Sequence, residues 1–196
     1  MWKKVYQAIN SNSISKGKTA MIWAPSVGFG YPYTGGQYSV NKTTDPNFPL
    51  LDTNRDGAFD KNDDPYASFY PGDEYVDWVG LSTYYFGPKF PWIDNALPSK
   101  DQFVNILTGA NGYGGSNFYK TYSEKAGKPF FITEGGAAYH LYFLANKTAI
   151  LTPGPGELPI KQAYWRQYLT NNQIQRQFPK LKAIGMFEIV KVYTLL

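Results

Sequence analysis

Oxygen-bearing side chains recur along residues 52–63 at the intervals of a calcium-binding loop. Positions 1, 3, 5, 9 and 12 of this segment supply side-chain oxygens, position 6 is Gly57, and position 7 offers a backbone carbonyl. The candidate ligands are Asp52, Asn54, Asp56, Ala58, Asp60 and Asp63. Calcium binds several such oxygens at once, so the segment predicts a structural Ca²⁺ site. The alternative is a plain surface turn rich in Asp and Asn.

A second candidate for chemistry is Glu134, which directly follows an apolar run and precedes two glycines. In a parallel α/β barrel, catalytic groups lie at the C-terminal ends of the strands. An acid in that place is costly unless it is used or paired. Glu134 is therefore either a catalytic carboxylate or a structural one paired with Lys or Arg.

Other chemistries are excluded or disfavoured by composition. The chain of 196 residues has no Cys, so disulfides and cysteine metal sites are excluded. Its single histidine, His140, disfavours a Ser-His-Asp triad and a His-cluster metal site. Aromatic residues make up 18% of the chain and argue against disorder. The net charge of +4 is mild and scattered, so we expect no nucleic-acid partner, and no apolar run predicts a membrane span.

The elements that must position these residues follow from the apolar pattern. Buried strands are expected at 19–24, 75–86, 128–134 and 181–192, and helices at 2–9, 99–107, 117–125 and 160–175. A long Gly- and Pro-rich loop at 26–75 holds the calcium motif, and 146–159 is a second expected loop. Strands that alternate with helices pair in parallel, so the predicted fold class is α/β.

Four sequence blocks occur in an order that resembles glycoside hydrolase family 26, the β-mannanase-like enzymes. They are Trp23-Ala-Pro25, Tyr70-Pro-Gly-Asp-Glu-Tyr-Val-Asp-Trp-Val-Gly-Leu81, Lys128-Pro-Phe-Phe-Ile-Thr-Glu-Gly135 and Met186-Phe-Glu-Ile-Val-Lys191. The resemblance implies a (β/α)8 TIM barrel of which this chain, residues 1–196, carries the C-terminal half, strands five to eight, with the calcium loop as an insertion.

The resemblance also implies roles for individual residues. Glu134 matches the nucleophile at the end of strand seven, and Tyr84 matches the tyrosine that hydrogen-bonds it. Candidate sugar-contacting residues in and after the strands are Trp23, Tyr31, Tyr33, Tyr84, Tyr85, Trp92 and His140. Aromatic rings suit the C–H faces of sugars, although the loop aromatics are equally explained by packing, and His140 by a hydrogen bond within its loop.

The implied activity is retaining hydrolysis of a β-glycan such as mannan. Retention needs a second carboxyl group as acid and base, which in this family lies on strand four. We find no substitute here, because Glu188 is better explained by a structural ion pair. The chain is thus expected to be a weak or inactive fragment of a secreted enzyme, monomeric if folded and without a signal peptide of its own. Alternatives are a non-catalytic carbohydrate-binding protein and a calcium-ordered adhesion module.

Overall fold

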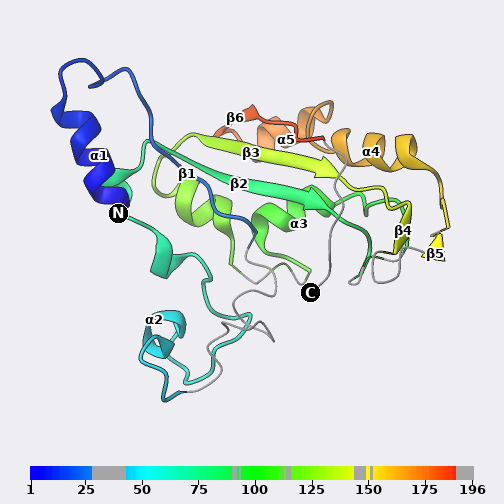
Figure 1. The fold of residues 1–196 in the computed structure, drawn as a ribbon, viewed down its shortest axis with the longest axis horizontal. Coiled ribbons are helices and arrows are strands. Elements are labelled where there is room, and N and C mark those ends of the chain that lie inside the picture. Colours follow the sequence, from blue (N-terminus) through cyan, green and yellow to red (C-terminus); the bar gives the residue numbers. More distant parts are fainter. Residues whose placement is uncertain are drawn as a thin grey trace.

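A computed structural model describes residues 1–27, 43–89, 92, 94–111, 113, 116–143, 149–150 and 152–188. Its centre is a parallel sheet with the strand order β1-β2-β3-β6 (Figure 1). The four strands are β1 (Ile22–Trp23), β2 (Trp78–Tyr85), β3 (Phe130–Ala137) and β6 (Leu181–Ile184). Two short strands, β4 (Tyr142–Phe143) and β5 (Ala149–Ile150), form a separate antiparallel pair. The predicted α/β class with a parallel sheet is confirmed, and the sheet is consistent with part of a TIM barrel.

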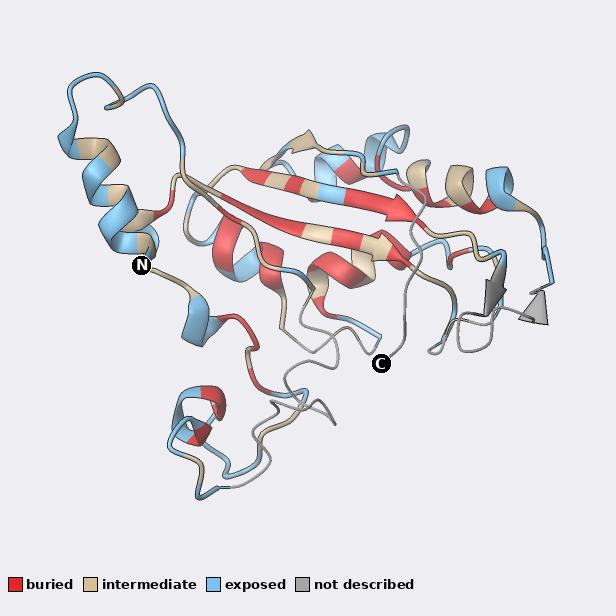
Figure 2. Ribbon diagram, viewed as in Figure 1, coloured by how far each residue is buried: buried red, intermediate tan, exposed pale blue. Residues whose placement is uncertain are grey.

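Helices pack against one face of the sheet and bury its alternate residues. The helical elements are α1 (Trp2–Ser11), α2 (Phe48–Leu51), α3 (Gln102–Thr108), α4 (Glu157–Trp165), α5 (Asn172–Gln177), the 3₁₀ turns η1 (Ala67–Phe69) and η2 (Asp73–Tyr75), and the π-helical η3 (Tyr119–Glu124). Val79 and Leu81 of β2 and Ile132 of β3 are fully buried in the core with side chains from α3, η3 and α4 (Figure 2). Because successive strand residues point to opposite faces, Ser82 and Tyr84 lie on the other, partly exposed face.

Element boundaries differ from the sequence prediction in ways that have local causes. The paired glycines were expected to end β3, yet the strand continues through both to Ala137. The single helix predicted at 160–175 begins earlier, at Glu157, and is interrupted before a second helix, α5. The side chain of Asn171 accepts a hydrogen bond from the Gln173 amide and caps this new helix. β6 ends at Ile184, and residues 189–192 of its predicted range lie outside the described residues.

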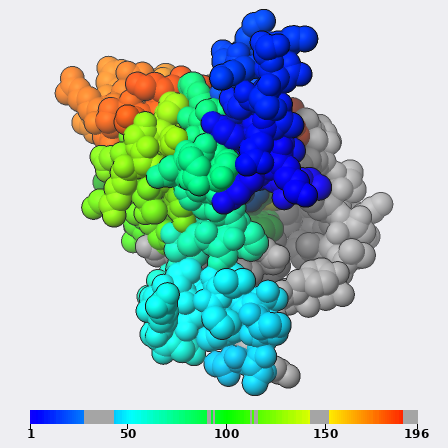
Figure 3. Space-filling model, turned by 90° about the vertical axis from the view of Figure 1, so that its left-hand side faces the viewer, coloured from blue at the N-terminus to red at the C-terminus, as the bar shows by residue number. Residues whose placement is uncertain are grey.

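The long segment between β1 and β2 carries structure of its own. Its described part contains α2, η1 and η2. The stretch around α2 protrudes as the cyan lobe at the bottom of Figure 3. Aromatic contacts join this segment to the start of η3, since the centroid of the Tyr66 ring lies 4.9 Å from that of Phe118. The Tyr122 hydroxyl also donates to Asp64 Oδ2 at 2.8 Å. Burial and this neighbouring carboxylate raise the pKa of Tyr122, so the phenol stays protonated as the donor.

Candidate functional site

Glu134 and Tyr84 meet at the C-terminal edge of the sheet. The Tyr84 hydroxyl donates a 2.7 Å hydrogen bond to Glu134 Oε2, as predicted from the sequence. Tyr84 is partly buried, whereas Glu134 is exposed, so its carboxylate is accessible from solvent. A carboxylate that is held from one side and open on the other is arranged to act as a nucleophile or a base.

An irregularity in the sheet brings these two side chains onto the same face. Leu81 pairs with Ile132, but the next residue, Ser82, pairs with Glu134, so Thr133 is an extra residue on β3. In an unbroken register Glu134 would instead lie opposite Thr83, on the face that is buried under the helices. The bulge therefore turns Glu134 from the helix-packed face to the face that carries Tyr84.

Aromatic rings surround this pair on the loops that follow the strands. The Phe86 ring stacks on Tyr84 with centroids 5.5 Å apart, and the Trp92 ring lies 5.1 Å from Phe86. Phe187, which follows β6, meets Tyr84 edge-on at 6.4 Å. Phe187 was missed as a site residue, although it lies within a block that carried the resemblance. Together these rings form an aromatic row beside the carboxylate.

Two predicted sugar-contacting residues lie in the core instead. Trp23 is 7% exposed and stacks on Phe118, because it pairs in register with Val79 and shares that residue's helix-facing side. Tyr85 is 3% exposed, since it follows Tyr84 on β2 and points to the opposite face. Burial raises the pKa of the Tyr85 phenol to about 12. Neither ring is available to a sugar. Tyr31 and Tyr33 lie outside the described residues.

His140 is hydrogen-bonded within the rim of the site. Its Nε2 lies 2.6 Å from the carbonyl oxygen of Phe86, which can only accept, so Nε2 carries the proton. Its backbone amide donates to Asn95 Oδ1 at 2.9 Å. Asn95, which is 6% exposed, was not anticipated from the sequence, because a lone asparagine in a loop has no distinguishing pattern.

Glu188 forms the ion pair that the sequence favoured for it. Lys161 Nζ lies 2.6 Å from Glu188 Oε2 and 2.8 Å from Glu157 Oε1. Burial alone lowers the pKa of Lys161, but the two carboxylates outweigh it and raise that pKa above its ordinary value. Glu188 is thus engaged by a cation, and it makes no hydrogen bond to Glu134 among the described residues.

The calcium motif folds into a tight turn around its own backbone amides. Asp52 accepts from the amides of Asp56 and Gly57, and Asp63 from those of Thr53 and Asp60. Gly57 has φ +84°, which fits the sharp turn expected at position 6. In the described part of the chain, no three carboxylate or imidazole groups come close enough together to hold a metal. The carboxylate oxygens of this loop are thus of the type that binds Ca²⁺. In this structure they accept hydrogen bonds from backbone amides instead.

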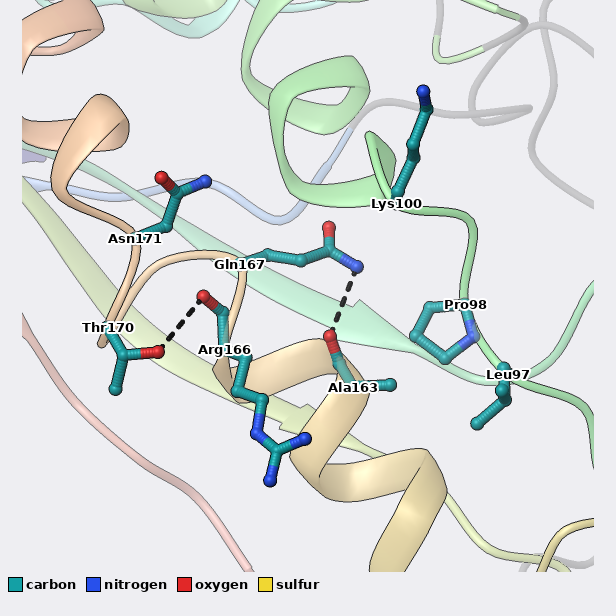
Figure 4. A pocket seen from close by; sticks show the side chains of 8 residues that line it. All are labelled: Leu97, Pro98, Lys100, Ala163, Arg166, Gln167, Thr170 and Asn171. Atoms are coloured by element: carbon teal, nitrogen blue, oxygen red, sulfur yellow. Dashed lines mark hydrogen bonds between the residues drawn. The ribbon is translucent and has the colours of Figure 1, made fainter.

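One surface hollow of about 460 Å³ lies elsewhere, between α4 and the segment before α3 (Figure 4). Its wall includes Lys100, Arg166 and Gln167. The two cationic side chains point in different directions in Figure 4, and Gln167 is occupied by hydrogen bonds to the backbone of Ser99 and Phe103. This hollow does not contain Glu134 or the aromatic row, so we do not assign the site to it.

Comparison with known sequences supports the assignment drawn from the site. The sequence model of glycosyl hydrolase family 26 matches residues 58–149, just under half of the chain. The resemblance to family 26 is confirmed. The match contains Tyr84, Trp92, Glu134 and His140, and it indicates a glycoside hydrolase whose substrate is a carbohydrate. It begins inside the calcium motif and leaves out Asp52, Asn54 and Asp56. A search of curated proteins finds no match to the chain.

None of the helices in the described ranges has the length and apolar character needed to span a lipid bilayer.

Proposed function

We propose that this family 26 chain carries the nucleophile side of a retaining β-glycanase site and acts on a β-mannan-type polysaccharide. The observation that carries the proposal is the 2.7 Å hydrogen bond from Tyr84 to an exposed Glu134 at the C-terminal edge of a parallel sheet. A carboxylate at this edge has the position that catalytic groups occupy in α/β barrels. The match of residues 58–149 to a glycosidase family supports the same reaction class.

The proposed reaction is a double displacement at Glu134. The carboxylate attacks the anomeric carbon as the bond to the leaving oxygen breaks, and a glycosyl ester forms. Water then attacks the same carbon, which frees the sugar with its configuration retained and returns the carboxylate. Tyr84 fixes the second carboxylate oxygen, so that the attacking oxygen keeps one direction.

The first step normally needs an acid to protonate the leaving group, worth ~10²–10⁴-fold in rate. In a retaining enzyme that group is a carboxyl about 5–5.5 Å from the nucleophile. The sequence offers no counterpart of the strand-four acid that the resemblance implies, and Glu188 is held by Lys161. We therefore expect natural glycosides to react slowly or not at all with this chain alone. In this proposal β1, β2, β3 and β6 correspond to strands five to eight of the barrel.

The aromatic row is the proposed sugar-binding surface. Tyr84 lies near the end of β2, and Phe86 and Trp92 follow that strand. The Phe86 ring stacks on Tyr84, and the Trp92 ring is tilted against Phe86. Sugar rings stack on such faces through their C–H groups, while polar atoms nearby hydrogen-bond the hydroxyls. Tyr31 and Tyr33 stay candidates for the same surface. We place the polysaccharide outside the cell and the protein there with it, as a monomer.

An activated fluorosugar tests the nucleophile without requiring the acid. The probe is the dinitrophenyl glycoside of β-mannobiose fluorinated at the second carbon, whose leaving group departs without protonation. Attack by Glu134 forms the glycosyl ester and releases one dinitrophenolate, and the fluorine slows hydrolysis so that the ester accumulates. We expect intact-mass spectrometry to show one added sugar, and peptide mapping to locate it at Glu134.

The matched control is Glu124→Gln, which removes a carboxylate from the surface end of η3. It should be labelled like the unchanged chain, whereas Glu134→Gln should not be labelled. Label on another carboxylate, or none on the unchanged chain, contradicts the proposed nucleophile. If Glu134→Gln still binds mannan oligosaccharides while no variant is labelled, the chain is a carbohydrate-binding protein instead.

The proposal includes a structural Ca²⁺ in the loop 52–63. The segment 52–64 holds five aspartates against Arg55 and Lys61, so its net charge is strongly negative. Asp52 and Asp63 are 8% and 1% exposed, and buried carboxylates are costly without a balancing cation. The ion would order the loop and take no part in the bond breaking.

A further inference from the structure

The amide of Asn95 links loops that follow different strands. Its Nδ2 donates to the carbonyl oxygens of His140 and Thr152, at 2.7 and 2.9 Å. Its Oδ1 accepts from the His140 backbone amide at 2.9 Å. The side chain is 6% exposed, so water does not readily replace these bonds. One buried amide thus ties the loop after β2 to the loop after β3 and to the segment ahead of α4.

The packing around Asn95 is tight as well as polar. Gly154, with φ +56°, brings its backbone directly against the carbonyl oxygen of Asn95, and a Cβ there would clash with that oxygen. The hydroxyl of Tyr85 donates to the carbonyl of Ala96 at 3.0 Å. The backbone at residues 95 and 96 is therefore constrained by Tyr85 of the core and by Gly154 of the loop ahead of α4.

His140 continues this connection towards the site. Asn95 holds both backbone polar groups of His140, its amide and its carbonyl. Its ring then donates from Nε2 to the carbonyl of Phe86 at 2.6 Å. Phe86 is the first residue after β2, and its ring stacks on Tyr84, the partner of Glu134. A shift of His140 would therefore move the aromatic row.

Only an amide satisfies this environment. The two carbonyls require a donor and the His140 amide requires an acceptor, and asparagine offers both in one short side chain. An aspartate keeps the acceptor but turns a negative oxygen towards two carbonyl oxygens. A leucine removes the partner of all three backbone groups at once, which is costly to the fold.

We infer that Asn95 and His140 form a latch that sets the position of the aromatic row, and that Asn95 is a positioning residue for sugar binding. The inference rests on the proposed function, because it assigns this role at the same site. It predicts that breaking the latch weakens sugar binding more than it slows the attack by Glu134, since Glu134 lies on β3 and keeps its own strand contacts.

The test measures labelling of the full chain by the activated fluorosugar at several concentrations. For Asn95→Asp we expect the half-saturating concentration to rise about tenfold, which corresponds to ~1.4 kcal/mol, while the maximal rate changes little. Asn172→Asp, the same chemical change at the exposed start of α5, should behave like the unchanged chain. His140→Leu should repeat the loss, and His140→Gln, which keeps a donor near the position of Nε2, should recover most of it.

The outcomes separate a latch from a purely structural role. If Asn95→Asp only unfolds part of the sample, the fraction that can be labelled falls, and the half-saturating concentration of the rest is unchanged. That result, or full binding strength in Asn95→Asp, overturns the latch while the proposed function stands. If the unchanged chain is never labelled, the proposed function itself fails, and the latch fails with it.

Discussion

At the scale of single residues, the candidate chemistry depends on a few hydrogen bonds with defined donors. Tyr84 gives its proton to Glu134, His140 gives one to Phe86, and Asn95 gives two and takes one. Each of these bonds joins residues more than forty positions apart in the sequence, so each depends on the fold. Two residue changes test how much the individual bonds contribute.

Removal of the Tyr84 hydroxyl should impair the nucleophile without unfolding the chain. In Tyr84→Phe the ring still stacks on Phe86, but the hydrogen bond to the carboxylate is gone. We expect the maximal labelling rate to fall about tenfold, since a bond to a charged group is worth ~1.5–3 kcal/mol and only part of it is used in positioning. Tyr139→Phe is the matched control. An unchanged rate in Tyr84→Phe would show that Glu134 does not need this partner.

The ion pairs of Lys161 should stabilise the chain at neutral pH and lose that effect in alkali. The pKa of Lys161 is raised in the folded state, so its contribution is complete below the ordinary value of 10.5 and is lost as pH rises through the folded pKa. Lys161→Met should lower the free energy of unfolding by ~1 kcal/mol at pH 7, because both partners are partly exposed.

Urea unfolding of both proteins across alkaline pH checks this expectation. The difference between the unchanged chain and Lys161→Met should shrink above the ordinary Lys pKa. A difference that stays constant with pH would mean that lost packing, and not lost charge, causes the destabilisation. Lys182→Met, at an exposed position of β6, serves as the control.

At the scale of elements, the bulge in β3 decides which face Glu134 occupies. The close contact of β2 and β3 beside it depends on Gly80. A Cβ at Gly80 would collide with the backbone oxygen of Phe131 and approach Thr133 Cγ2 to 3.1 Å. The two strands leave no room for a side chain there.

Gly80→Ala should therefore disturb the pairing of the two strands that carry the site. We expect a loss of about 1–3 kcal/mol in the free energy of unfolding, since the obstructing atom is backbone and cannot rotate away. Ser82→Ala, which only removes an oxygen on the same face, should cost much less. Equal midpoints of urea unfolding for both variants would contradict the close packing.

The calcium loop is an element whose proposed ion has a simple test. We expect Ca²⁺ to bind with one site per chain by titration calorimetry and to raise the unfolding temperature, because the ion binds only the folded loop. Asp52→Asn should weaken that binding, whereas Asp101→Asn, outside the loop, should not. A titration without heat, together with an unfolding temperature that does not respond to a chelator, would contradict the site.

At the scale of the whole molecule, the described residues centre on a four-stranded parallel sheet with helices on one face. The partly exposed face carries Tyr84, and the C-terminal edge carries the carboxylate and the aromatic row. In a closed barrel that face would point inward and be filled by side chains from the other strands. The proposed chemistry thus needs groups beyond those that surround Glu134 here.

We accordingly expect the chain to release little reducing sugar from β-mannan. The rate should lie far below the usual enzyme range of about 1–10³ s⁻¹, even where the activated fluorosugar labels Glu134. Addition of azide or formate, small anions that can act in place of a missing base, should speed turnover of the dinitrophenyl glycoside without fluorine. Mannan hydrolysis at ordinary enzyme rates would show that a general acid is already present.

The sequence by itself predicted the contact between Tyr84 and Glu134 and the class of fold. Glu134 after an apolar run and the alternation of strands with helices are local patterns that can be recognised along the chain, and the resemblance to family 26 added the role of Tyr84. The ion pair of Glu188 was also expected, although its partner Lys161 was not named. These features depend on residue type and on spacing within one element.

The tertiary structure decided which side chains share a face and which groups join across loops. A single extra residue, Thr133, turns every later side chain of β3 to the opposite face of the sheet. No local sequence pattern indicates that shift. Trp23 and Tyr85 lie in the core because register with neighbouring strands, and not residue type, sets their direction. Asn95 acquires its role only where loops distant in sequence meet, since hydrogen bonds between segments form in space and leave no trace in spacing.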